Sequence, residues 1–284
     1  MMYVSDWSSD VSPRAEAPRR QRSHGQLSFD VTSINGLTRP ARIAESGPSR
    51  IRLPNVPTGE LEAVIMNTGG GVACGDRFEV AANAGPDTHT VMTTPAAERV
   101  YKSDGPVATV DVSIRVEKDA VFSWLPQETI LYDRARLRRS FSAEIAGSAS
   151  FSMFESIVFG RAAHGERIAE GLLEDRWRIR RDGKLIYADT LRLEGPIADL
   201  LDKPSIAKGS RALATFLHVA PDAENRLEPV RELMENASCD CAASSWNGML
   251  VLRFLAPDIG SLRRAAIDIL TRFRGAPLPR VWHS

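Results

Sequence analysis

The chain has 284 residues, of which 43% are hydrophobic and 25% are charged, proportions typical of a globular protein with a sizeable core. Its 36 Lys and Arg residues balance its 36 Asp and Glu residues, so the formal net charge is +0. A chain without net charge has no overall basic field that could hold nucleic acid. Such a chain also lacks the electrostatic repulsion that keeps protein molecules apart in solution, so its charge favours association with other proteins.

The cysteines are Cys74, Cys239 and Cys241, a sparse and odd set that is not a disulfide framework. Cys239 and Cys241 share one face of a strand, but two thiols are too few for a metal site, and we interpret them as small buried residues. The N-terminus has no apolar signal segment, and no stretch approaches the roughly 18 apolar residues of a membrane span. We therefore predict a cytoplasmic protein that binds neither membrane nor nucleic acid.

Residues 1–22 are rich in Ser, Pro and Arg and poor in apolar side chains, so we expect a flexible N-terminal tail. The following residues form short alternating segments separated by Gly-Pro and Asp-Gly turns. The clearest strand covers residues 108–116, where every second side chain is apolar. We predict that residues 23–284 form a single, mainly β domain.

The last third of the sequence adds a few helices to the strands. Pro229 suits the first turn of one helix. Ser261 is expected to cap a second helix, and Gly275 to end it. Between them, Asn247-Gly248 predicts a hairpin turn.

Two predicted strands carry a carboxylate on an otherwise apolar face. Glu155 interrupts the apolar alternation of residues 151–159, and Asp189 interrupts that of residues 185–193. A buried carboxylate must be protonated, paired, hydrogen-bonded or metal-bound, because an isolated buried charge is costly. An apolar replacement is often as stable as a buried ion pair, so the pattern favours a functional polar interior.

Arginines offer simpler explanations for both acids. Arg161 or Arg192 could pair with either carboxylate, and a β-bulge could turn Glu155 outward. A basic stretch also follows residue 133, and we interpret it as a solvated strand edge, with contact to an acidic partner surface as the alternative. Its members are Arg134, Arg136, Arg138 and Arg139.

A glycine-rich segment over residues 67–77 suggests a phosphate-binding loop at first sight. A dinucleotide-binding spacing would need a third glycine where Cys74 stands, no helical pattern follows, and no GK[ST] motif is present. We interpret these glycines as positions of positive φ or close packing.

Several blocks, in order, resemble the UreD family of urease accessory proteins. The glycine-rich block reads GGVACGDR, although Cys74 stands where the family usually has glycine. Asn67-Thr68 also replaces a common His-Pro-Pro start, which removes a possible histidine ligand. The other blocks are TTPAAERVYKS at residues 93–103, WLPQETILYD at 124–133, FGRAAHGE at 159–166 and LPRVW at 278–282.

The resemblance implies a β-rich scaffold of two stacked sheets, wound in a β-helix-like manner, with helices in the C-terminal third. It also implies a non-enzymatic chaperone that binds UreF directly, recruits the GTPase UreG through UreF, and docks on apo-urease. UreG rather than this chain would bind GTP, and no cofactor would be held tightly. Ni²⁺ would pass transiently through the interior towards the urease active site.

On this basis we expect a row of carboxylates to line the nickel path. Asp76 is the aspartate of the glycine-rich block, and Glu155 and Asp189 fall at acidic positions of later family strands. Carboxylates are hard oxygen ligands, whereas nickel is held more tightly by nitrogen or sulfur, so they suit transit. The predicted path residues are Asp76, Glu98, Glu128, Glu155 and Asp189.

Two other functions remain open at the level of sequence. A metal-dependent hydrolase could use the same interior carboxylates, and it would show turnover and hold its metal tightly. A pure interaction scaffold would tolerate replacement of the interior acids and would lose activity only through changes at its surface.

Overall fold

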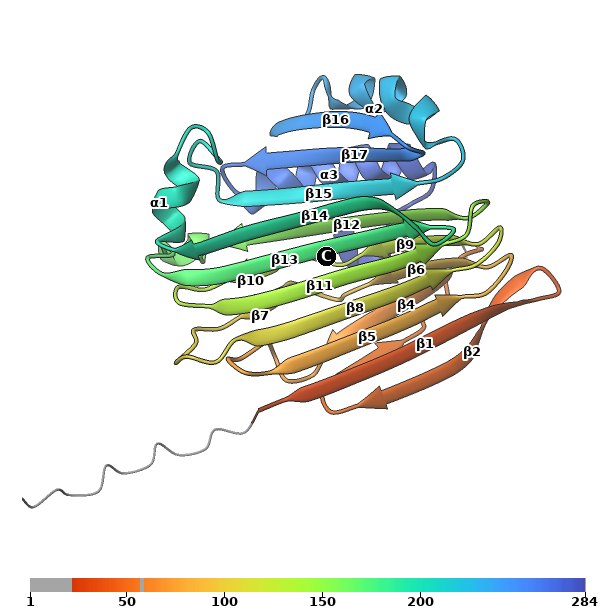
Figure 1. The fold of residues 1–284 in the computed structure, drawn as a ribbon, viewed down its shortest axis with the longest axis horizontal. Helices are drawn as coiled ribbons and strands as arrows, with labels where there is room; N and C mark the ends of the chain where they lie inside the picture. The colour runs from red at the N-terminus through yellow and green to blue at the C-terminus, as the bar shows by residue number, and fades with distance from the viewer. Residues whose placement is uncertain (1–21, 57–58, 284) are drawn as a thin grey trace, which may run out of the picture.

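The structure of the protein, a computed structural model, describes residues 22–56 and 59–283. Except for Arg22, the predicted N-terminal tail lies outside the described residues. Within them the chain forms two stacked β-sheets with a small group of helices at one end (Figure 1).

Sheet A faces the viewer in Figure 1. The described residues provide seven strands for it, in the spatial order β14 (Lys184–Gly195), β13 (Gly171–Arg181), β11 (Arg136–Ile145), β8 (Ala108–Val116), β5 (Arg77–Ala84), β1 (His24–Ile34) and β2 (Leu37–Ser46).

Sheet B lies behind it and has ten strands within the same described ranges. Its main order is β16 (Asp240–Trp246), β17 (Met249–Ala256), β15 (Ala212–Val219), β12 (Ser150–Phe159), β9 (Val121–Leu125), β6 (His89–Thr93), β4 (Leu61–Asn67) and β3 (Ser49–Arg52). The short strands β10 (Thr129–Leu131) and β7 (Glu98–Val100) extend it beside β12.

The chain winds between the two sheets. Strands β4, β6, β9 and β12 of sheet B alternate along the sequence with β5, β8, β11 and β13 of sheet A, and neighbours within each of these sets are parallel. Parallel neighbours need a crossover connection, usually a helix, and here a strand of the opposite sheet provides it. The predicted β-helix-like arrangement of two stacked sheets is confirmed, with 52% of the described residues in strands and 16% in helices.

Sheet B is covered on both faces, which explains the burial of almost every side chain in β12. Phe151 and Met153 pack between the sheets, whereas Phe154 and Val158 pack towards the C-terminal helices. Paired with β15, the strand runs without a register shift from Phe151 to Val158. Glu155 is therefore buried, and the alternative in which a bulge turns it outward is wrong.

The helices belong to the later part of the chain, as predicted. They are α1 (Ile197–Asp202), α2 (Leu227–Met234) and α3 (Ile259–Arg274), with 3-10 turns at Ala162–His164, Ala223–Arg226 and Arg280–His283. Helix α1 was not predicted from the sequence. Helices α2 and α3 pack against the outer face of sheet B beside β15, β16 and β17.

The predicted cap of α3 is wrong by three residues. Asp258, rather than Ser261, precedes the helix in an extended conformation, and its Oδ1 accepts a hydrogen bond from Ser261 N at 2.8 Å. A carboxylate also complements the positive end of the helix dipole. Gly275 ends the helix in the left-handed conformation, as expected.

The predicted hairpin between β16 and β17 is confirmed. Asn247 and Gly248 both have positive φ, at 52° and 72°, the pair of values that a type I′ turn requires.

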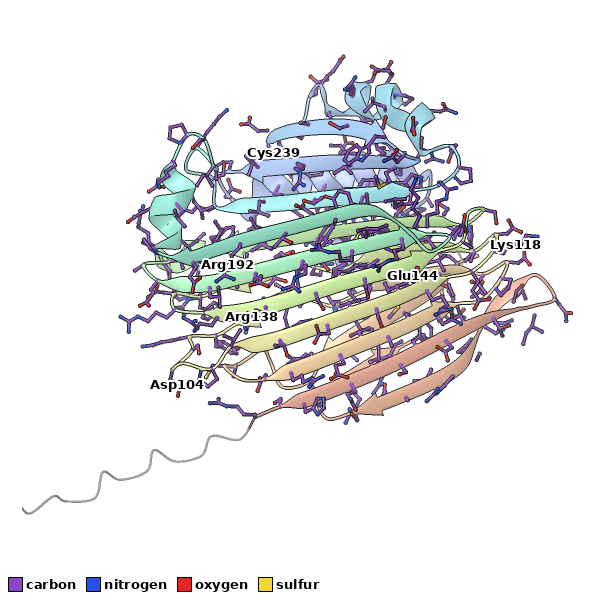
Figure 2. All side chains as sticks on the ribbon, viewed as in Figure 1. Asp104, Lys118, Arg138, Glu144, Arg192 and Cys239 are labelled. Atoms are coloured by element: carbon purple, nitrogen blue, oxygen red, sulfur yellow. The ribbon has the colours of Figure 1, made fainter. Side chains whose placement is uncertain are left out.

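The outer face of sheet A is polar and solvated. Arg138, Glu144 and Arg192 lie on it in Figure 2, and their side chains are about half exposed, at 53%, 46% and 51%. Glu174 accepts contacts from Arg176, Arg192 and Arg138 at 2.5, 2.7 and 3.8 Å.

No helix within residues 22–56 and 59–283 combines the length and the hydropathy of a membrane span.

Burial of His218 in β15 makes stability depend on pH. Its Nδ1 lies 2.8 Å from Ser152 Oγ, and burial, helped by the charge of Arg226, lowers its pKa from 6.5 to about 4. The unfolded chain therefore binds more protons than the folded chain between these pH values, so stability falls as pH falls from about 6.5 towards 4.

We predict that the His218→Gln variant loses this acid sensitivity. Between pH 7 and pH 5 the unfolding free energy of the wild type should fall by about 2 kcal/mol more than that of the variant. Urea denaturation at the two pH values measures this difference. Equal losses in both proteins would show that His218 is not the group responsible.

Candidate functional site

Three charged side chains lie paired between the sheets. Arg139 of β11 donates from Nη1 to Glu155 Oε2 at 2.5 Å, and from Nε and Nη2 to Asp175 Oδ1 and Oδ2 at 3.0 and 2.5 Å. The exposed fractions of Arg139, Glu155 and Asp175 are 8%, 7% and 6%. Glu155 belongs to sheet B and Asp175 to sheet A, so the guanidinium joins the two sheets.

Strand alternation explains why these charges point inward. Inward-facing positions of β11 are otherwise apolar, including Leu137 and Phe141 on either side of Arg139. Asp175 likewise lies between Leu173 and Trp177, both buried, in β13. In the parallel pairing of these strands Arg139 lies directly opposite Asp175. Their contact therefore follows from the register of the sheet.

Each carboxylate has a second donor. The indole Nε1 of Trp124 donates to Glu155 Oε1 at 2.7 Å, and the indole Nε1 of Trp177 donates to Asp175 Oδ1 at 3.1 Å. Arg139 Nη1 also lies 3.3 Å from Thr129 Oγ1. The polar atoms of this cluster are thus almost all hydrogen-bonded, as a buried network requires.

Burial and charge act in opposite directions on this cluster. Burial raises the pKa of Glu155, and the guanidinium of Arg139 opposes that rise. For Arg139, burial would lower the pKa, but the charges of Asp175 and Glu155 outweigh it and raise the pKa above its ordinary value. Arg139 therefore stays charged, and Glu155 is more easily protonated than an exposed glutamate.

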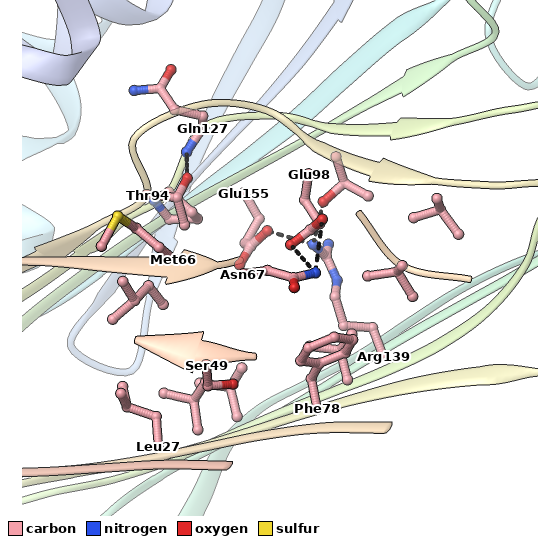
Figure 3. Close-up of a pocket in the computed structure, with 18 of the residues that line it drawn as sticks. Leu27, Ser49, Met66, Asn67, Phe78, Thr94, Glu98, Gln127, Arg139 and Glu155 are labelled. Atoms are coloured by element: carbon pink, nitrogen blue, oxygen red, sulfur yellow. Dashed lines mark hydrogen bonds and ion pairs between the residues drawn. The ribbon is translucent and has the colours of Figure 1, made fainter. Parts of the chain in front are cut away.

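A first pocket, the Glu98 pocket, opens beside this cluster and has a volume of about 120 Å³. Glu98 accepts hydrogen bonds at 3.5 Å from Asn67 Nδ2, and these side chains point towards Arg139 and Glu155 in Figure 3. Burial raises the pKa of Glu98 to about 7. Glu98 therefore exchanges its proton near neutral pH.

A second pocket, the Asp189 pocket, lies on the other side of the cluster and has a volume of about 300 Å³. Asp189 Oδ2 accepts hydrogen bonds from Arg253 Nη2 at 2.7 Å and from Tyr187 Oη at 3.1 Å. Burial raises the pKa of Asp189, but its contacts with Arg253 and Tyr187 outweigh this effect and lower it overall. Asp189 therefore remains ionised at neutral pH.

The structure brings three of the predicted path residues to these pockets. Glu98 lines the first pocket, Asp189 lines the second, and Glu155 lines both. The suggestion that Glu155 pairs with an arginine is correct, but its partner is Arg139 rather than Arg161 or Arg192.

The other two predicted path residues line neither pocket. Asp76 is buried and holds the glycine-rich loop in place, because its two oxygens accept from Ser23 N at 2.7 Å and Ala73 N at 2.8 Å. Glu128 lies 3.5 Å from Arg263 Nη1. Asp76 therefore stabilises the loop, and Glu128 lies beside helix α3.

Arg139 and Asp175 were missed in the sequence. The interpretation of residues 134–139 as a solvated edge is wrong for Arg139, which is buried, although it holds for Arg138. The signal was present, because Arg139 and Asp175 occupy alternate positions among apolar residues, as Glu155 does. The neighbouring arginines at positions 134, 136 and 138 make the segment look uniformly basic and obscure that alternation.

The glycine-rich segment forms a loop between β4 and β5, with no helix after it. At Gly71, φ is 146°, and an added Cβ would lie 2.8 Å from Arg99 O. Close backbone packing therefore explains this glycine, as predicted.

Within the described part of the chain, no group of three or more His, Cys, Asp or Glu side chains is arranged to hold a metal ion. Cys239 and Cys241 are partly buried, and burial raises the pKa of both thiols, that of Cys239 to about 11. Burial thus favours the protonated thiol over the thiolate at both positions.

Known proteins resemble the chain over nearly its whole length. The family described as UreD urease accessory protein matches residues 23–283. A urease accessory protein UreD of Xanthobacter autotrophicus is 53% identical over 284 residues, which cover 98% of each chain. The corresponding protein of Azorhizobium caulinodans is 53% identical over 268 residues, or 94% of this chain and 99% of its own. That of a Methylobacterium species is 52% identical over 278 residues, or 96% and 99%.

The raised pKa of Glu98 predicts a pH-dependent stability of the opposite sign to that of His218. Since the folded chain binds more protons than the unfolded chain between pH 4.5 and about 7, stability falls as pH rises through this interval. On going from pH 5 to pH 8, the unfolding free energy of the Glu98→Gln variant should rise by about 2–3 kcal/mol relative to that of the wild type. Urea denaturation measures it, with Glu144→Gln, on the outer face, as the control. A gain shared by both variants would contradict the assignment.

Proposed function

The chain belongs to the UreD urease accessory protein family, and from this premise we propose that it is a non-enzymatic chaperone that helps deliver Ni²⁺ to apo-urease. Family membership implies a role in urease maturation and contact with urease and other accessory proteins. The observation that carries the finer proposal is the row of carboxylates through two adjoining interior pockets.

The proposed path follows the winding of the chain. The Glu98 pocket lies between earlier strands, including β4, β5 and β8, and the Asp189 pocket lies between later ones, including β13, β14 and β17. Both lie between the sheets, and they meet at Glu155 and Arg139. A cation that moves from one pocket to the other thus crosses the strands inside the stack.

The chemistry of this row suits transit rather than storage. Glu98, Glu155 and Asp189 offer oxygen ligands, to which nickel binds less tightly than to nitrogen or sulfur. Neutral hydrogen-bonding groups such as Asn67 and Thr215 also line the pockets and suit the water shell of a hydrated ion. A conduit needs this weak binding, because the ion must leave again.

The proposed partners are UreF, bound directly, UreG, recruited through UreF, and apo-urease. UreG would bind GTP, which is consistent with the structural, rather than phosphate-binding, use of the glycine-rich loop here. We place the chain in the cytoplasm as part of this assembly.

The first experiment is rescue of a urease-positive strain that lacks its own UreD gene. We expect this chain, expressed with its cognate urease and accessory proteins, to restore urease activity and nickel in the active site. Full activity of the strain without the chain, in ordinary nickel, would contradict the proposal.

Asp189→Asn then tests the path with little damage to the fold, because its partner Arg253 is 56% exposed and can be hydrated. We expect the variant to form the complex but to lower nickel per urease active site several-fold. Glu128→Gln is the matched control, since Glu128 lines neither pocket. If urease were fully loaded with nickel in the presence of Asp189→Asn, the remaining interpretation would be an interaction scaffold without a nickel path. Substrate turnover by the isolated chain would favour the hydrolase alternative.

A further inference from the structure

Arg139 stands at the junction of the two pockets. Of the described residues that line either pocket, Arg139 and Glu155 alone line both. Figure 3 shows the two side chains close together among the residues that line the Glu98 pocket. Anything that moves from one pocket to the other must therefore pass this guanidinium.

The guanidinium closes this junction in the observed conformation. It occupies three carboxylate oxygens at 2.5, 2.5 and 3.0 Å, the same oxygens that a passing cation would need as ligands. Its own positive charge also repels an approaching cation. At an effective dielectric constant of about 20, two unit charges about 4 Å apart repel each other by several times the thermal energy.

The charges of the cluster nevertheless match a divalent ion better than they match arginine. Glu155 and Asp175 carry two negative charges when ionised, and Arg139 balances one of them. A divalent cation would balance both. Each carboxylate also keeps an indole donor, from Trp124 or Trp177, that does not depend on Arg139.

We propose that Arg139 is the gate of the path: its guanidinium holds the place of the cation between Glu155 and Asp175 and turns into an adjoining pocket when a divalent ion passes. This inference rests on the proposed nickel path. The pockets on either side provide the space for the turn. A role in stability alone explains the cluster poorly, because apolar side chains of similar volume are often as stable as a buried ion pair.

The test is equilibrium dialysis of the full-length chain against Ni²⁺. We expect the Arg139→Gln variant to gain one nickel site that is at least about tenfold tighter than any interior site of the wild type, because the competing charge is gone. Adding Glu155→Gln and Asp175→Asn to this variant should abolish the new site. A nickel affinity of Arg139→Gln equal to that of the wild type would overturn the gate.

Arg161→Gln is the matched control. Its Nε and Nη2 donate to Glu166 Oε2 and Oε1, both at 2.9 Å, and the side chain of Glu166 is 14% exposed. The loss of Arg161 leaves one acid that still accepts from the backbone N–H groups of Asp133 and Arg161, rather than two acids that shared a guanidinium, so no nickel site should appear. A comparable site in this control would mean that any acid deprived of its arginine binds nickel, which would also overturn the proposal.

Arg139→Lys keeps the test decisive if Arg139→Gln does not fold. One ammonium retains the positive charge but cannot reach both carboxylates as the forked guanidinium does. Its nickel affinity should lie between those of the wild type and Arg139→Gln, and an affinity no higher than that of the wild type contradicts the gate.

Dialysis involves no urease, so failure of the gate and failure of the path are distinguishable. No new site in Arg139→Gln, together with reduced nickel loading by Asp189→Asn, would remove the gate and keep the path. A new site together with full loading by Asp189→Asn would keep the gating chemistry and remove the delivery route.

Discussion

The pairing of Arg139 with Glu155 and Asp175 is the constraint on which the interior depends. Two stacked sheets that enclose three charged groups are stable only while those groups satisfy one another, since removing one partner of a buried pair costs about 3–5 kcal/mol. The guanidinium meets this condition by bonding to acids from both sheets. It thereby sets how the sheets face each other at the point where the two pockets meet.

The winding of the chain turns this local pairing into a row. In sheet A, parallel strands place Phe78, Val110, Arg139 and Asp175 directly opposite one another across β5, β8, β11 and β13. In sheet B, Glu155 lies opposite Thr215, and Thr215 lies opposite Arg253, which pairs with Asp189. Side chains that are far apart in sequence therefore line up across the strands. The polar ones extend from Arg139 and Asp175 in sheet A to Glu155, Thr215 and Arg253 in sheet B.

Much of the fold could be predicted from local patterns, and part of the site could as well. Alternation identified β8 and the buried position of Glu155, and Asn247-Gly248 identified the last hairpin. Asp189 is only half-buried, because β14 is the edge strand of sheet A and has a register shift in its pairing. The pockets depend on which strands of opposite sheets face each other, and no local pattern records that. Arg139 could have been found, since it obeys the same alternation as Glu155.

The central claim is that nickel travels through the interior, and filling the Asp189 pocket tests it without removing any charge. Thr215 is buried and lines that pocket opposite Glu155, so Thr215→Phe should narrow it. Ser142→Phe adds the same ring to the outer face of sheet A and serves as the control. The measurement is nickel per urease active site after activation by complexes that contain each variant. We predict a several-fold loss of nickel with Thr215→Phe and none with Ser142→Phe. Wild-type loading by a correctly assembled Thr215→Phe complex would contradict the interior route.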